Sequence, residues 1–190
     1  RQYLFRLHAY AGKDLDGTVT LNAYGPHIER PLGSTTVFTN TTAGPCHLQE
    51  PPYVMLEPPH VHKLTGNAAD HTVTDCEITG MAPDFLTVLA PYKSGVATGA
   101  DAPLNVIPLE TENGAAWMIE GADFVDVAWL REEGAANTLQ TPSGHVIETD
   151  GKFVLLSLDG TIALLNRGTR LELDNEIVLS AQDSISLKQE

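Results

Sequence analysis

The segment KFVLLSLDGTIALLNRGTRLELDNEIVLSAQDSISLK, residues 152–188, decides the fold class. Its apolar runs are short and are interrupted by the turn residues Asp159-Gly160, Asn166-Arg167-Gly168 and Asp174-Asn175. Such runs are too short for a helix with a buried face, and an Asp-Gly pair between two of them is typical of a hairpin with a type I′ turn. The segment therefore predicts five short strands in one antiparallel meander, packed against a second sheet that earlier residues form.

Strand patterns recur about every ten residues before this meander, with turn residues between them. RQYLFRL and TVTLNAY, residues 1–7 and 18–24, are predicted to pair as a hairpin. FLTVLAPY, residues 85–92, is predicted to be a central strand buried on both faces. Further strands are predicted at residues 71–78, 115–119, 124–129 and 144–148. No segment has a helical periodicity. We therefore predict an all-β chain, an antiparallel two-sheet β-sandwich, in a single domain over residues 1–190.

Composition narrows the function classes. The chain has 190 residues with 25 acidic and 11 basic side chains, for a formal net charge of -14. Such a charge repels phosphate backbones and anionic lipid headgroups, and no segment has the length and apolar character of a membrane span or a signal peptide. We predict that neither nucleic acid nor a membrane is a partner. Because the chain begins at Arg1 inside a predicted strand, we expect a fragment or processed product of a longer chain.

The segment 26–59 differs from the rest in composition, because it holds seven of the twelve prolines. Proline fixes φ and lacks the backbone donor that a sheet needs. The segment is therefore predicted to be mostly a long surface connection, with short edge strands at residues 34–39 and 53–56. A long connection in a compact domain is usually a binding loop, a loop that contacts another domain or a mobile segment. We predict contact with another domain.

Two groups of residues are of types that can bind a metal ion or form a disulfide. His60 and His62 would share one face of an extended backbone and could bind one metal with His71 or a carboxylate. The surrounding proline-rich loop, and the lack of a third ligand at a diagnostic spacing, favour solvent-facing or hydrogen-bonded histidines, so no metal site and no cofactor are assigned. Cys46 and Cys76 would form one disulfide in an exported protein or remain as two buried thiols.

Catalytic signatures are lacking in the sequence: it has no Gly-x-Ser-x-Gly, no glycine-rich phosphate loop and no Cys-x-x-Cys. The acidic pair Glu132-Glu133 is interpreted as a solvated surface. Trp117 and Trp129 lie in apolar strand patterns and are interpreted as core residues rather than sugar-binding platforms. Three tyrosines at strand ends are better candidates for exposed aromatic or acid–base groups: Tyr10, Tyr24 and Tyr92.

Segments at both ends of the chain, and one in the middle, resemble a single enzyme family. These segments are YLFRL (3–7), AGK (11–13), LNAYGP (21–26), FLTVLAPY (85–92), LLNRGTRLEL (164–173), IVLS (177–180) and SISL (184–187). They resemble the entry strands, the central strand and the closing meander of the C-terminal β-sandwich domain in heparinase II/III-like polysaccharide lyases. The resemblance extends over nearly the whole chain.

The resemblance implies an extracellular or periplasmic enzyme that cleaves uronic-acid-containing polysaccharide by β-elimination. In that family an (α/α) toroid precedes the sandwich, a Tyr/His pair abstracts the proton α to the carboxylate, and catalysis takes place in the cleft between the two modules. This chain has no helical segment, and the family's His/Asp-rich opening segments would precede Arg1. It has Tyr24 where many relatives have a histidine before Gly-Pro. No catalytic or substrate-binding residue is therefore carried over.

We expect the chain to pack on an N-terminal catalytic module, to wall its polysaccharide cleft and to be inactive alone. The alternative is a self-standing extracellular β-sandwich for adhesion, assembly or carbohydrate binding. In an assembly protein, residues 1–7 would be the strand donated to a neighbour.

Overall fold

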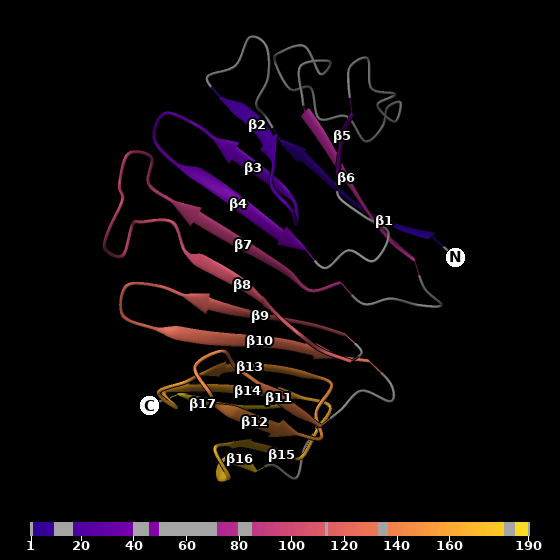
Figure 1. The fold of residues 1–190 in the computed structure, drawn as a ribbon, viewed down its shortest axis with the longest axis vertical. Helices are drawn as coiled ribbons and strands as arrows, with labels where there is room; N and C mark the ends of the chain where they lie inside the picture. The colour runs from indigo at the N-terminus through magenta and orange to yellow at the C-terminus, as the bar shows by residue number, and fades with distance from the viewer. Residues whose placement is uncertain are drawn as a thin grey trace. The chain divides into compact units, whose positions relative to one another are not determined.

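The structure is a computed structural model that describes residues 2–9, 17–39, 46–49, 72–79, 85–112, 114–132, 137–180 and 185–189. All regular elements among these residues are β-strands in antiparallel pairs (Figure 1). This confirms the prediction of an all-β antiparallel fold. The chain divides into two compact units, residues 1–96 and 97–190, and each is described by itself. The expectation of a single domain stays a prediction.

The unit of residues 97–190 is a two-sheet β-sandwich. Its larger sheet has the order β17-β14-β13-β10-β9-β8, and its smaller sheet has the order β11-β12-β15-β16. The larger sheet consists of β8 (Asn105–Leu109), β9 (Gly114–Glu120), β10 (Val125–Arg131), β13 (Phe153–Ser157), β14 (Ile162–Asn166) and β17 (Ile185–Gln189). The smaller sheet consists of β11 (Thr138–Gln140), β12 (Val146–Thr149), β15 (Arg170–Leu173) and β16 (Glu176–Ser180).

Apolar side chains from both sheets form the core of this unit. Trp129, Leu156 and Leu165 come from the larger sheet, and Ile147 and Leu171 come from the smaller sheet. All five are at most 2% exposed. Full burial of one such aliphatic side chain stabilises a fold by about 1.5–3 kcal/mol. Alternating apolar residues on short strands therefore suffice to hold two sheets together here.

The five C-terminal strands do not form one layer, so the prediction of a single meander is wrong. β13 and β14 form a hairpin in the larger sheet, β15 and β16 form a hairpin in the smaller sheet, and β17 returns to pair with β14. The chain crosses between the sheets at residues 167–169, where Arg167 has a φ of 53°. Leu165 and Leu171, on either side of the crossing, are both fully buried in the same core. β14 and β15 can bury their apolar residues whether they lie in one sheet or in two. The alternation of apolar and polar residues therefore does not distinguish a single meander from a crossing between sheets.

The turns also differ from the sequence prediction. At Asp159-Gly160 only Gly160 has a positive φ, 78°, and its backbone N–H donates to the Ser157 carbonyl over 2.8 Å. This is a type I turn followed by a left-handed glycine rather than the predicted type I′ turn. The type I′ conformation occurs between β15 and β16, where Asp174 and Asn175 have φ values of 53° and 68°.

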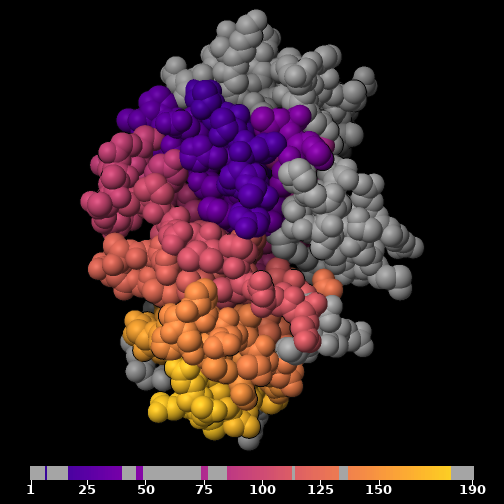
Figure 2. Space-filling model, viewed as in Figure 1, coloured from indigo at the N-terminus to yellow at the C-terminus, as the bar shows by residue number. Residues whose placement is uncertain are grey.

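The unit of residues 1–96 contains two smaller sheets. One has the order β1-β6-β5, and the other has the order β2-β3-β4-β7. The first consists of β1 (Gln2–Ala9), β5 (His47–Gln49) and β6 (Thr72–Thr79). The second consists of β2 (Thr18–Leu21), β3 (Pro26–Glu29), β4 (Ser34–Thr39) and β7 (Thr87–Tyr92). Figure 2 shows the segment 17–39, in indigo, at the surface of the molecule.

The predicted hairpin between the first two strands is wrong, because β1 pairs with β6 and β2 pairs with β3. The reason is a tight local turn. The side-chain oxygen of Asn22 accepts hydrogen bonds from the backbone N–H groups of Tyr24 and Gly25 at 2.7 and 2.8 Å. The Asn22 N–H donates to the Gly25 carbonyl at 2.9 Å. An Asx turn of this kind directs β2 onto the next segment of the chain.

Two further predictions need correction. The segment 26–59 was expected to be mostly connection, but it contributes β3, β4 and β5, and β4 lies inside its sheet rather than at an edge. β7 was expected to be central, but it is the terminal strand of its sheet and Leu89 is 59% exposed. Pro91 suits that place, because a terminal strand tolerates the missing N–H. Residues 53–56 lie outside the described residues.

Candidate functional site

One face of the sheet β2-β3-β4-β7 gathers polar side chains. Strand register places His27 opposite Thr36 and Ser34 opposite Tyr92. Alternate residues of a strand share a face, so all four side chains lie on the same face. We call His27, Ser34, Thr36 and Tyr92 the polar face. Ser34 is buried, and the other three are half-buried.

His27 connects two hydroxyl groups on this face. Its Nδ1 lies 2.9 Å from the Thr36 Oγ1, and its Nε2 lies 3.2 Å from the Tyr92 hydroxyl. The rings of His27 and Tyr92 stack with centroids 6.0 Å apart and an interplanar angle of 16°. A neutral imidazole donates through one nitrogen and accepts through the other, so the three groups form one hydrogen-bonded chain in either tautomer. Such a chain can bind hydroxyl groups of a ligand and can carry a proton between Tyr92 and Thr36.

The polar face is fixed at one end by two serines. The Ser34 hydroxyl lies 2.9 Å from the Ser94 hydroxyl, and the Ser94 hydroxyl donates to the Arg30 carbonyl over 2.5 Å. These bonds join the β3–β4 connection to the chain that follows β7. The spacing between His27 and Tyr92 is therefore held by strand pairing and by side-chain bonds.

The tyrosine candidates have different positions. Tyr92 belongs to the polar face. Tyr24 is half-buried, its ring lies 6.4 Å from the Phe38 ring, and its carbonyl accepts a bond from the Thr39 N–H at 3.2 Å. Tyr10 lies outside the described residues. No sequence signal indicated His27, because Pro26 suggested the end of a strand where β3 in fact begins.

Trp117 and Trp129 are 3% and 2% exposed, which confirms that they are core residues. Glu132 is exposed, as expected of a solvated surface, and Glu133 lies outside the described residues. Cys46 and Cys76 form a disulfide between the start of β5 and β6, which resolves the two alternatives that the sequence left open.

His60, His62 and His71 lie outside the described residues, so the interpretation of these side chains as solvent-facing or hydrogen-bonded histidines stays a prediction. Within the described ranges, no group of three or more His, Cys, Asp or Glu side chains is placed to hold a metal ion. Across the same ranges, no helix is long and apolar enough to span a membrane.

A hollow of about 250 Å³ lies beside the crossing from β14 to β15, but Asp150, Arg170 and Glu172 in its lining are engaged in contacts within the unit. The Asp150 carboxylate accepts bonds from the Thr169 N–H and hydroxyl and from the Arg170 N–H at 2.6–2.8 Å. Arg170 also forms an ion pair with the buried Glu172. These contacts fix the crossing, and we assign them a structural role.

The pKa of Asp150 reflects these bonds. Partial burial acts to raise it, but the hydrogen bonds from Thr169 and Arg170 outweigh burial and the pKa is lowered. A carboxylate whose folded-state pKa is depressed stabilises the fold above its unfolded-state pKa of about 3.9 and loses that contribution as the pH falls through the lower folded-state value.

Replacement of Asp150 by alanine is therefore expected to lower the free energy of unfolding by about 0.5–1.5 kcal/mol at neutral pH, because the carboxylate is exposed and solvent screens its interactions. The difference from the wild type should shrink as the pH falls below about 4. Urea titrations at several pH values measure both effects, with Asp101→Ala as a control at an exposed carboxylate in the same unit. A difference that does not change with pH would contradict the role of the charged carboxylate.

A second acidic group joins two turns at the surface. The Asp174 Oδ2 lies 2.7 Å from the His145 Nδ1, and its Oδ1 accepts a bond from the Val146 N–H at 2.9 Å. The hydrogen bond from His145 is the main cause of the lowered pKa of Asp174, and the Val146 bond adds to it. Both side chains are exposed, at 39% and 48%. The pair ties the turn before β12 to the turn between β15 and β16.

Comparisons with known proteins add no relatives. No protein-family model matches the chain, and no curated protein or solved structure matches it significantly.

Proposed function

We propose that the chain is the C-terminal β-sandwich of a heparinase II/III-like polysaccharide lyase, and that its polar face walls the polysaccharide cleft of a catalytic module outside this chain. The observation that carries the proposal is the connected set of His27, Thr36 and Tyr92 on one sheet face. Imidazole and hydroxyl groups donate to and accept from sugar hydroxyls, and a paired sheet holds them in fixed positions. Most of this face comes from the segment 26–59, where the sequence predicted contact with another domain.

The disulfide of the unit of residues 1–96 supports an extracellular or periplasmic location. A disulfide such as Cys46–Cys76 persists in oxidising compartments and is rare in the cytosol. The net charge of -14 would repel a uronate polymer, so attraction of the polymer would fall to the catalytic module. The sandwich would contribute shape and neutral hydrogen-bonding groups.

The first test uses the isolated chain. Incubated with glycosaminoglycan or alginate, it is expected to produce no rise in the absorbance of unsaturated uronate. A rise would contradict the assignment of catalysis to another module.

The second test uses the longer gene product and the variants Tyr92→Phe and His27→Gln. We expect each to raise KM about tenfold, which corresponds to about 1.4 kcal/mol of binding, and to change kcat less than about twofold. Leu32→Ala is the control, because Leu32 is 89% exposed and lies outside the polar face. Loss of kcat by orders of magnitude would make the pair catalytic, and unchanged kinetics would remove the polar face from the cleft. Either result contradicts the proposal.

The alternative of a self-standing adhesion or assembly protein predicts large oligomers in light scattering, whereas the lyase proposal predicts a monomer. Donation of residues 1–7 to a neighbour would have to replace a pairing within the chain, because β1 already pairs with β6 along its whole length. This pairing favours the lyase proposal.

A further inference from the structure

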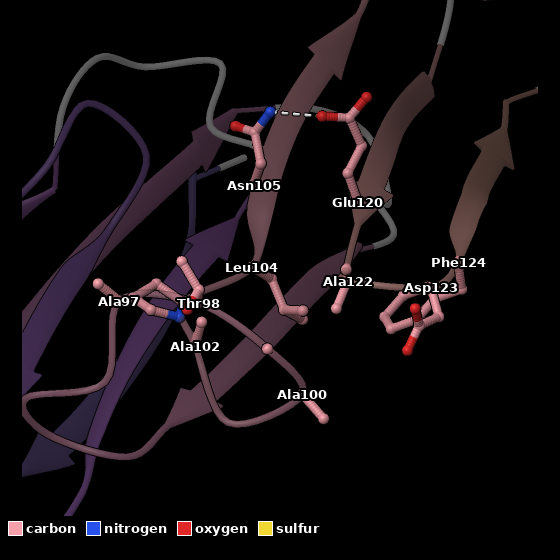
Figure 3. Close-up of a pocket in the computed structure, with 13 residues that line it drawn as sticks. Ala97, Thr98, Ala100, Ala102, Leu104, Asn105, Glu120, Ala122, Asp123 and Phe124 are labelled. Carbon is pink, nitrogen blue, oxygen red and sulfur yellow. Dashed lines mark hydrogen bonds between the residues drawn. The ribbon is translucent and has the colours of Figure 1, made fainter.

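A hollow of about 430 Å³ lies in the unit of residues 97–190, between the segment 97–104 and the turn from β9 to β10. Figure 3 shows the Asn105–Glu120 pair at one end of it, Leu104 and Ala122 in its middle, and Phe124 beside Asp123 at the other end. The volume is in the range of small-molecule sites. Neither the polar face nor the proposed lyase role involves these residues.

Phe124 is an exposed aromatic ring at the edge of this hollow. It is 41% exposed and is not part of the apolar core of its unit. The ring packs against Gly121, since a Cβ at that position would lie 2.2 Å from the Phe124 Cε1. A backbone bond of 3.0 Å from the Gly121 N–H to the Phe124 carbonyl closes the turn. The glycine therefore leaves room for the ring beside the turn, with part of its surface open to a ligand.

The other end of the hollow is polar. Asn105 and Glu120 are opposite each other on β8 and β9, and the Asn105 amide donates to the Glu120 carboxylate over 2.5 Å. Beyond this bond, the pair has one further amide N–H, one amide oxygen and one further carboxylate oxygen. An amide and a carboxylate side by side can accept from and donate to neighbouring hydroxyl groups of one ligand.

The charge of the lining selects the kind of ligand. Glu120 and Asp123 contribute carboxylates, and the described lining contains no Lys, Arg or His. A uronate or a sulfate ester would meet like charge there, whereas a neutral hydroxylated ligand would not. An aromatic ring beside hydrogen-bonding groups suits a ligand with one apolar face and polar edges. A pyranose ring has both, because its C–H groups lie on its faces and its hydroxyls at its edge.

We infer that this hollow binds a neutral pyranose unit of a polysaccharide, with Phe124 as the platform and the Asn105–Glu120 pair as the hydrogen-bonding partners. The inference does not depend on the proposed lyase role, and it can be tested on the isolated chain without a catalytic module. The two proposals can therefore fail separately.

The binding test compares two trisaccharides that differ in charge. β-1,4-Mannotriose and β-1,4-trimannuronate share ring configuration and linkage, but only the second is charged. Titration calorimetry with the isolated chain is expected to give a millimolar or tighter Kd for mannotriose and at least about tenfold weaker binding of trimannuronate at low salt. The difference in affinity between the two trisaccharides should become smaller at high salt, because salt screens the repulsion between carboxylates. No binding of mannotriose up to about 10 mM, or equal binding of the two, would overturn the inference.

Variants locate the site. Phe124→Ala is expected to weaken mannotriose binding at least about tenfold, and Phe124→Tyr should retain it. Gly121→Ala should also weaken binding, because the added methyl displaces the ring without removing it. Ile177→Ala is the matched control, since Ile177 is another exposed apolar side chain of the same unit, at 61%. Wild-type affinity of Phe124→Ala, or equal loss in Ile177→Ala, would contradict the assignment. Thermal unfolding of each variant checks that the fold is retained.

Discussion

Loss of the Cys46–Cys76 disulfide is expected to destabilise the unit of residues 1–96 by about 3–4 kcal/mol and to leave the unit of residues 97–190 unchanged. The bond joins residues 30 positions apart, and a cross-link that closes a loop of this length removes that much conformational entropy from the unfolded chain. β5 has three residues and pairs with β6, so the disulfide is a large share of what holds it. Both cysteines are buried, and the Cys46 Sγ lies 3.6 Å from the Tyr24 carbonyl, in the turn between β2 and β3 of the other sheet of the unit.

The distribution of aromatic residues allows the two units to be followed separately. Both tryptophans, Trp117 and Trp129, lie in the unit of residues 97–190, so tryptophan fluorescence reports on that unit. Hydrogen exchange of the β4 and β6 amides reports on the other. In urea with reductant, protection of β4 and β6 should be lost at lower denaturant while the tryptophan transition stays in place. The variant Cys46→Ser/Cys76→Ser should behave like the reduced protein and should not respond to reductant. If reduction shifts the tryptophan transition to lower urea by as much as it shifts the loss of β4 and β6 protection, the two units do not unfold independently.

The strands were predictable from the sequence to a large extent, because alternation and turn residues are local signals. β9, β10, β13 and β14 appear where the apolar runs indicated them. Sequential hairpins such as β13–β14 were predictable, but the partners of strands far apart in the chain were not, because no local signal indicates such a pairing. β1 pairs with β6, some seventy residues later in the chain. The crossing after Asn166 was equally hidden, since Leu171 would be buried in either sheet.

The candidate sites show the same limit. His27 and Tyr92 are 65 positions apart and meet through two strand pairings, which no spacing in the sequence indicates. Phe124 reads as the first apolar residue of a strand, and its exposure depends on the turn at Gly121. The sequence indicated Tyr92 as a candidate because it stands at a strand end, where side chains are often accessible. That His27 is the hydrogen-bonding partner of Tyr92 became evident only from the fold.

Replacement of Leu165 by alanine is expected to be among the most damaging single changes in the unit of residues 97–190. Leu165 is 0% exposed and belongs to the core that both sheets share. One of its methyl groups packs against Gly151, where an added Cβ would lie 2.2 Å away. Because β14 pairs with β13 and β17 on its two sides, the backbone has little freedom to move into the space that the variant leaves. The lost contacts and the cavity together should cost about 2–5 kcal/mol.

The effect can be measured by the tryptophan transition in urea, since both tryptophans report on this unit. For a unit of this size, a loss of about 3 kcal/mol corresponds to a fall in Tm of roughly 12–24 °C. Leu165→Met should cost less than about 1.5 kcal/mol, because it nearly conserves volume, and Ile177→Ala should stay within about 0.5 kcal/mol of the wild type, because Ile177 is 61% exposed. Equal effects of Leu165→Ala and Ile177→Ala would mean that the two sheets do not share the core described above, since only a side chain enclosed between them leaves a cavity when it is shortened.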